Sequence, residues 1–120
     1  DGLNFGNTST AYDRHRPAIA RAERRLYDHV VRRFGGGLSG RPLRADARDL
    51  IAAARTALDR LAPAGDFHLI ATGGLETAAD VAAALGAGAS LCGWFTGYFE
   101  AFSRHGHRLY AELLAELAAA

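Results

Sequence analysis

Two short loops that contain glycine, Thr72-Gly73-Gly74 and Phe95-Thr96-Gly97, each follow an apolar run that is typical of a strand. Backbone N–H groups from two such loops can surround one anion, and a helix that begins after the first loop adds its positive N-terminal end. In (β/α)8 barrels a phosphate site of this kind commonly lies at the ends of the last two strands. The sequence therefore predicts a phosphate site formed by these two loops.

The elements that must position these loops follow a β-α-β-α order. The apolar and glycine patterns predict strands at 2–6, 67–71 and 89–94, and helices at 17–34, 46–61, 77–85 and 103–119. Short turns between them favour parallel strands, whose carboxyl ends lie on one face of the sheet. The strand at 67–71 is expected to be covered on both faces. We expect an α/β fold with about three parallel strands, the C-terminal part of a (β/α)8 TIM barrel.

A helical excursion is expected at about residues 12–35, after the first strand. Its apolar positions recur at three- and four-residue steps from Ile19 to Phe34, with Pro17 near the first turn. The arginines of this helix are interpreted as a solvated face. The segment at 35–43, Gly-Gly-Gly-Leu-Ser-Gly-Arg-Pro-Leu, is too rich in glycine for a regular element and is typical of a segment that binds or moves.

The composition argues against several classes of function. The chain has 120 residues, 49% of them hydrophobic, and a net charge of +1, which fits one globular unit. All 14 basic residues are arginine, and no pattern of interleaved aromatic and basic residues favours nucleic acid. The single Cys92 has no partner, and the five histidines are not spaced as a metal site. We therefore expect no metal and no nucleic acid.

The beginning of the sequence indicates a part of a longer protein. Asp1 stands inside a predicted strand, and the sequence contains no Met. Open edges of a parallel sheet pair with other strands, so we expect further strands of the barrel upstream of Asp1. The lack of a disulfide framework favours a cytoplasmic compartment.

Five strings along the chain match one known family in order and spacing. They are residues 1–8, 36–43, 70–74, 86–91 and 95–97. Together they resemble the C-terminal part of dihydroorotate dehydrogenase, and Gly-Gly-Leu-Ser-Gly-Arg-Pro-Leu at 36–43 resembles its quinone-linked class. The resemblance implies a barrel that binds flavin mononucleotide (FMN) and oxidises dihydroorotate to orotate in pyrimidine biosynthesis, with a quinone as electron acceptor.

The resemblance also implies roles for single residues. Asn7 and Thr8 would hydrogen-bond the pyrimidine substrate, dihydroorotate or orotate, and Gly6 would lie beside the flavin. Gly40 would let the glycine-rich segment approach FMN closely. The phosphate of FMN would be held by Gly74, Phe95 and Thr96, with Gly73 and Gly97 in the same cofactor-binding set.

The chain departs from the family pattern at two of these positions. Phe95 stands where Tyr is usual, and Gly6 stands where a hydroxyl residue is common. The catalytic base and the flavin-side Lys of the family cannot be assigned to this chain and are expected upstream of Asp1. We therefore expect this segment alone to be inactive.

Two other interpretations remain open. Another phosphate-binding TIM-barrel enzyme, such as a synthase or an isomerase, would share the Gly73-Gly74 loop but not the motif at 36–43. A truncated barrel without catalysis would instead be an interaction module that uses its arginine-bearing helix. If the complete protein is quinone-linked, we expect it in the cytoplasm or at the cytoplasmic face of the inner membrane, bound there through a region that precedes Asp1.

Overall fold

A three-stranded parallel sheet forms the centre of the structure, a computed structural model that describes residues 1–119. The strands are β1 (Gly2–Phe5), β2 (His68–Thr72) and β3 (Leu91–Gly93), in the order β1-β2-β3. Phe5 is paired with Ala71, and Thr72 with Gly93. The three predicted strands and their parallel order are therefore confirmed, and their carboxyl ends lie side by side.

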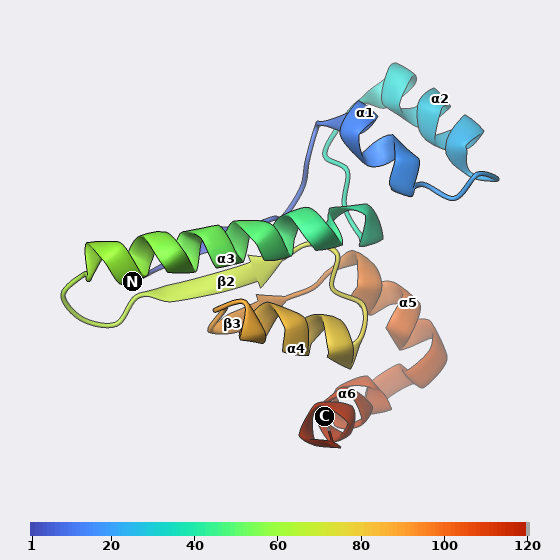
Figure 1. The fold of residues 1–120 in the computed structure, drawn as a ribbon. Helices are drawn as coiled ribbons and strands as arrows, with labels where there is room; N and C mark the ends of the chain where they lie inside the picture. Colours follow the sequence, from blue (N-terminus) through green and yellow to red (C-terminus); the bar gives the residue numbers. More distant parts are fainter. Residues whose placement is uncertain (120) are drawn as a thin grey trace.

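The helices are α1 (Tyr12–His15), α2 (Arg24–Phe34), α3 (Arg44–Leu61), α4 (Ala78–Gly86), α5 (Thr96–His105) and α6 (Leu109–Ala119). Short 3-10 helices span Arg16–Ala18, Arg41–Leu43 and Gly106–Arg108. Two of the helices, α3 and α4, pack against this sheet, whereas α1 and α2 stand apart from it (Figure 1). Helix α3 contacts β1 and β2, α4 contacts β3, and α6 lies against α4. This is an α/β arrangement of the kind expected for the C-terminal part of a (β/α)8 barrel.

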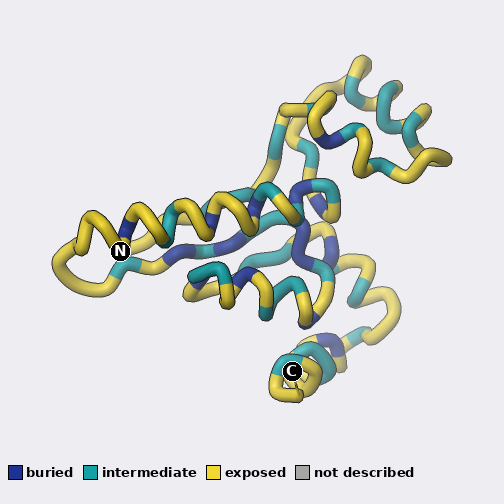
Figure 2. Tube along the Cα trace, viewed as in Figure 1, coloured by how far each residue is buried: buried dark blue, intermediate teal, exposed yellow. Residues whose placement is uncertain are grey.

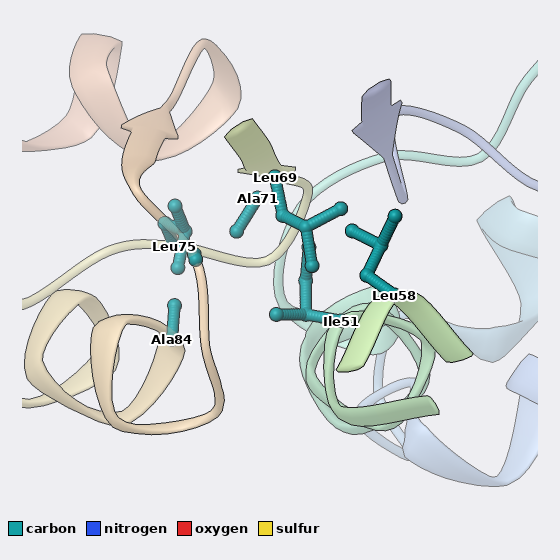
Figure 3. Packing of buried hydrophobic residues seen from close by; sticks show 7 residues of the cluster. Ile51, Leu58, Leu69, Ala71, Leu75 and Ala84 are labelled. Atoms are coloured by element: carbon teal, nitrogen blue, oxygen red, sulfur yellow. The ribbon is translucent and has the colours of Figure 1, made fainter. Parts of the chain in front are cut away.

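The hydrophobic core lies between β2 and the helices α3 and α4 (Figures 2 and 3). Alternate residues of β2, Leu69 and Ala71, are buried against Ile51 and Leu58 of α3. Leu75 joins the same cluster from the loop after β2. His68 of β2 is exposed, because the helices cover only one face of the strand. The expectation that this strand is covered on both faces is therefore wrong for the described residues.

The excursion at 12–35 contains two helices rather than one. The predicted helix at 17–34 is wrong in its first part, because residues 19–23 are not helical and α2 begins at Arg24. Ile19 has an extended backbone that ends the 3-10 helix containing Pro17. Arg24 holds the resulting turn by donating hydrogen bonds to the carbonyl oxygens of Ile19 and Pro17, at 3.1 and 3.0 Å. These contacts, which reach five and seven residues back along the chain, decide where the helix begins.

The C-terminal part also differs from its prediction. Helix α5 begins at Thr96, inside the second predicted phosphate loop, whereas the sequence predicted one helix from 103. Gly106, whose φ is +55°, ends α5, and α6 follows after a 3-10 turn. A left-handed residue cannot continue an α-helix, so the chain changes direction there.

Replacing Ile51 by Ala tests the core. Ile51 is 0% exposed, so the change should lower the free energy of unfolding by about 2–5 kcal/mol, from lost burial and the cavity that remains. Leu61→Ala at the end of the same helix, where the side chain is 74% exposed, should change it by less than about 0.5 kcal/mol. Urea unfolding of both variants measures the difference, and equal losses would contradict this description of the core.

The ion pair that folds α2 onto the preceding turn should depend on pH. Arg16 donates two hydrogen bonds of 2.7 Å to the carboxylate of Asp28, and these lower the pKa of Asp28 below its ordinary value. Because the folded pKa is the lower one, the stabilisation is present above about pH 4, the pKa of an unfolded Asp, and is lost as the pH falls through the folded pKa.

Amide hydrogen exchange, corrected for intrinsic rates, measures this effect. Protection of α2 should decrease below about pH 4 in the unmodified chain. In Asp28→Asn the protection should be low at every pH. A wild-type protection that stays constant through this range would show that the pair does not hold α2.

Candidate functional site

The loops at the carboxyl ends of the three strands meet around one cavity of about 220 Å³. The glycine-rich segment before α3 completes its wall. Its lining residues are Asn7, Thr8, Ser39, Gly40, Thr72, Gly73, Gly74, Leu75, Trp94, Phe95, Thr96 and Gly97. The structure thus brings together all the site residues predicted from the sequence except Gly6, which does not line the cavity.

Glycines allow these loops to touch through their backbones. A Cβ atom at Gly73 would overlap the carbonyl oxygen of Gly6, and one at Gly97 would overlap the carbonyl oxygen of Leu75. Gly40 lies against Thr96, whose methyl carbon would be 3.2 Å from an added Cβ. The backbone of Gly6 therefore packs against Gly73, a residue of the cavity wall, although Gly6 itself does not line the cavity. The missing side chains are what let four separate segments share one wall.

Unpaired backbone donors belong to the loop after β2. Within residues 1–119, the N–H groups of Gly74 and Leu75 donate to no acceptor of the protein, whereas that of Gly73 faces β3, where Thr72 is paired with Gly93. Gly73 and Gly74 have φ values of +102° and +75°, a succession that glycine adopts without strain. Successive N–H groups in a turn of this kind form a typical anion-binding concavity.

The helix that contributes its N-terminus to this cavity is α5. Thr96 and Gly97 line the cavity, and Phe95 at the N-cap provides no side-chain hydrogen bond to the first turn. Helix α4, by contrast, begins outside the cavity and is capped by Thr77 and Asp80. The expectation that the helix after the first loop adds its positive end is therefore wrong, because no residue of α4 lines the cavity and the carboxylate of Asp80 lies at this helix start, where it accepts from the N–H groups of Glu76 and Thr77.

Two hydroxyl contacts lie at or near the cavity. The hydroxyl groups of Ser39 and Thr96 are 2.9 Å apart and share a hydrogen bond. Thr72 donates a hydrogen bond of 2.7 Å to Asn4, which satisfies a polar side chain in the middle of β1. Ser39 was not assigned from the sequence, although its place in the motif at 36–43 is a signal that would have included it.

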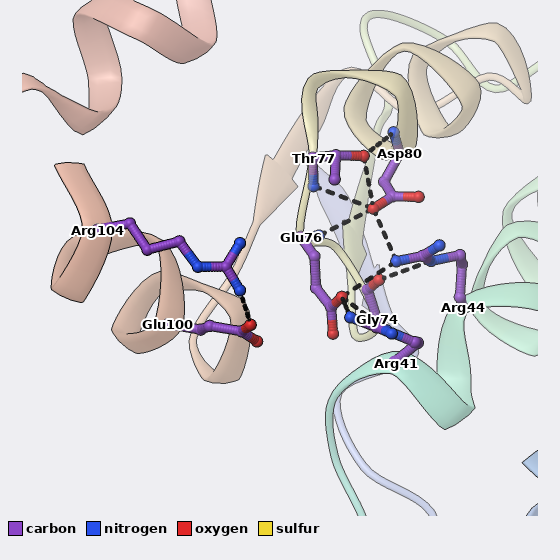
Figure 4. A network of polar contacts seen from close by, with 8 residues as sticks. All are labelled: Arg41, Arg44, Gly74, Glu76, Thr77, Asp80, Glu100 and Arg104. Atoms are coloured by element: carbon purple, nitrogen blue, oxygen red, sulfur yellow. Dashed lines mark hydrogen bonds and ion pairs between the residues drawn. The ribbon is translucent and has the colours of Figure 1, made fainter. Parts of the chain in front are cut away.

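A network of charged residues surrounds the segment that follows the loop of Gly73, Gly74 and Leu75 (Figure 4). Arg41 contacts the carboxylate of Glu76 at 2.8 Å, and this hydrogen-bonded partner raises the pKa of Arg41. Arg44 reaches Glu76 at 3.3 Å and Asp80 at 3.0 Å. The sequence analysis missed this network. Only the spacing of Thr77 and Asp80, typical of a helix start, gave a local signal for one of its members.

The excursion does not contribute to the cavity. None of the described residues between 12 and 35 lines it. A pair of backbone hydrogen bonds between Ser9 and Leu38, 3.0 and 2.8 Å long, joins the two ends of the excursion. His15, 4% exposed, lies 3.0 Å from the hydroxyl of Ser9 and fixes the base of the excursion.

The chemistry available in the cavity is binding rather than proton transfer. Its lining side chains are hydroxyls, one amide, one indole and hydrocarbon groups, and none of them titrates near neutral pH. Among residues 1–119, no three His, Cys, Asp or Glu side chains gather in a metal-binding arrangement. In the same part of the chain, no helix is both long and apolar enough to cross a membrane. The unpaired N–H donors and the absence of acidic lining residues favour an anion.

A pair of glycine substitutions separates backbone strain from loop contact. Gly36 and Gly73 both have positive φ, +93° and +102°, but nothing lies within 4 Å of a Cβ at Gly36. Gly36→Ala should lower the free energy of unfolding by about 1–2 kcal/mol, the left-handed penalty alone. Gly73→Ala should cost clearly more in urea unfolding, because the Gly6 carbonyl must also move. Equal losses would show that the close approach is unimportant.

The sequence was compared with known proteins. The sequence model of the family described as dihydroorotate dehydrogenase matches residues 1–117. A relative from Kineococcus radiotolerans, named dihydroorotate dehydrogenase (quinone), is 41% identical over 83 residues. The alignment covers 68% of this chain and 21% of that relative, so the chain spans about a fifth of its length. With the match extending from β1 to α6, the chain belongs to the dihydroorotate dehydrogenase family.

Proposed function

We propose that residues 1–120 supply the phosphate-binding and substrate-side walls of an FMN-dependent oxidoreductase that oxidises dihydroorotate to orotate. In this proposal the chain is the C-terminal part of an FMN-binding barrel, with the excursion at 12–35 as an addition. The observation that carries it is the cavity where unpaired N–H groups of Gly74 and Leu75 meet the N-terminus of α5.

The donor set fits a phosphate group. Backbone N–H groups and a helix N-terminus both favour a dianion, and no lining side chain is acidic. Phe95 takes the place of the usual Tyr without loss of these backbone donors. A cavity of about 220 Å³ is smaller than the roughly 300–1,000 Å³ of complete ligand pockets, so it accommodates part of a nucleotide such as FMN.

At the substrate side, Asn7 and Thr8 would orient the pyrimidine ring. An Asn side chain both donates and accepts, which matches the alternating N–H and C=O groups of a dihydropyrimidine. Bound FMN supplies the acceptor for the hydride that leaves one ring carbon. The proton from the neighbouring carbon must go to a base other than the cavity-lining side chains, because none of these is basic. Asn7 and Thr8 therefore bind and orient, and Gly40 leaves room for a flat ring.

The electron acceptor in this proposal is a quinone. Its support is the name of the Kineococcus radiotolerans relative and the motif Gly-Gly-Leu-Ser-Gly-Arg-Pro-Leu at 36–43. A quinone is dissolved in the membrane, so the working protein would lie at the cytoplasmic face of a membrane.

Flavin binding tests the proposal. The purified protein should bind FMN, seen as quenching of flavin fluorescence, and should bind it more tightly than riboflavin, which lacks the phosphate. Sugar phosphates should compete only weakly. Tight binding of sugar phosphates without flavin binding would instead support a synthase or isomerase.

A substitution at Thr96 tests the position of the phosphate. Thr96→Glu places a negative charge at the cavity and should weaken FMN binding by at least about tenfold through repulsion. Ser103→Glu, an exposed position later in the same helix, adds the same charge away from the cavity and should leave the affinity unchanged. An unchanged FMN affinity in Thr96→Glu, measured by fluorescence titration, would show that the phosphate binds elsewhere.

A further inference from the structure

We propose that Arg44 is a positioning residue that gives the cavity its preference for a phosphate, although it does not line the cavity. It does so by holding the loop of Gly73, Gly74 and Leu75 and by neutralising the carboxylates that follow this loop. The inference rests on the proposed function, because it assumes that the loop binds the phosphate of FMN.

The backbone of Arg44 lies directly against the loop. A Cβ atom at Gly74 would be 2.5 Å from both the nitrogen and the Cα of Arg44. The Nε of Arg44 donates a hydrogen bond of 3.2 Å to the carbonyl oxygen of Gly74. The C=O of Gly74 and the N–H of Leu75 belong to the same planar peptide group and point in opposite directions. A hydrogen bond that holds the carbonyl therefore also holds this N–H. Arg44 therefore fixes the orientation of a donor that belongs to the cavity wall.

The same guanidinium group holds the segment that continues from the loop. It contacts the carboxylates of Glu76 at 3.3 Å and Asp80 at 3.0 Å. Asp80 in turn accepts hydrogen bonds from the N–H groups of Glu76 and Thr77, at 3.1 and 3.0 Å. One arginine thus ties the loop, the helix cap and the start of α3 into one unit (Figure 4).

Arg44 also determines the charge next to the proposed phosphate. The side chains of Glu76 and Asp80 are only 14% and 10% exposed, so water screens them weakly. Without Arg44, Asp80 would lose its only arginine partner among the described residues, and Glu76 would keep Arg41. The largely buried carboxylate of Asp80, left without an arginine partner, would then repel a dianion bound by the loop that precedes it. This repulsion acts on the phosphate and not on the uncharged flavin ring.

The ratio of FMN affinity to riboflavin affinity is the measurement that isolates this role. Arg44→Met keeps a long side chain but removes the charge and the donors. FMN binding should weaken at least about tenfold, while riboflavin binding stays the same, so the ratio falls. Arg44→Lys should restore part of the ratio, since it restores the charge but not the three-way geometry. Arg48→Met, on the next turn of α3, where the side chain is 57% exposed and 3.8 Å from Asp49, is the matched control and should leave the ratio unchanged.

Each result has a definite meaning. An unchanged ratio in a folded Arg44→Met protein overturns the inference, and so does an equal loss of both ligands, which indicates a merely structural role. If Arg44→Met does not fold, Arg44→Lys decides, and a wild-type ratio in that variant overturns the inference. A wild-type protein that binds FMN no better than riboflavin overturns the proposed function itself, which is a separate failure.

Discussion

The close approach of four loops through their glycines is the constraint on which the site depends. The parallel register sets the strand ends level, with Phe5 beside Ala71 and Thr72 beside Gly93. Only the absence of side chains at Gly73 and Gly97 then lets the loop backbones meet. Leu75, buried in the core, fixes the middle of this arrangement. The unpaired N–H groups at the cavity are therefore held by packing and are not free to find partners within the protein.

The charged side chains of this region do not line the cavity. The lining side chains are neutral, whereas the arginines and carboxylates of the network pair with one another. A neutral wall of dipoles stabilises an anion without a counter-ion that must first be desolvated. The charged network contributes rigidity, because Arg41, just before α3, and Arg44, its first residue, connect this part of the chain to the cap of α4. This division gives the backbone the binding role and the side chains the supporting role.

Local patterns predicted much of this fold, and contacts between distant residues decided the rest. The short apolar run of β2 and the apolar spacing of α3 were sufficient to place both elements. The break before Arg24 was not predictable, because it depends on hydrogen bonds from Arg24 back to Pro17 and Ile19. Helix α5 was missed at its start, since Phe95 is a poor N-cap and Thr96 was assigned to a loop. The two glycine loops of the cavity were predicted from their position after strands and Gly40 from the family resemblance, whereas Arg44 acts through tertiary contacts that leave no local pattern.

The bridge between Ser9 and Leu38 bears on how this family can diversify. The chain leaves the body of the fold at Ser9 and returns beside it at Leu38, with the two backbones hydrogen-bonded to each other. Residues can be added to or removed from the intervening hairpin of helices without moving Asn7 on one side or Gly40 on the other. Evolution is thus free to lengthen or shorten the excursion while the cavity keeps its shape, and an alignment of relatives should concentrate its gaps between these two positions.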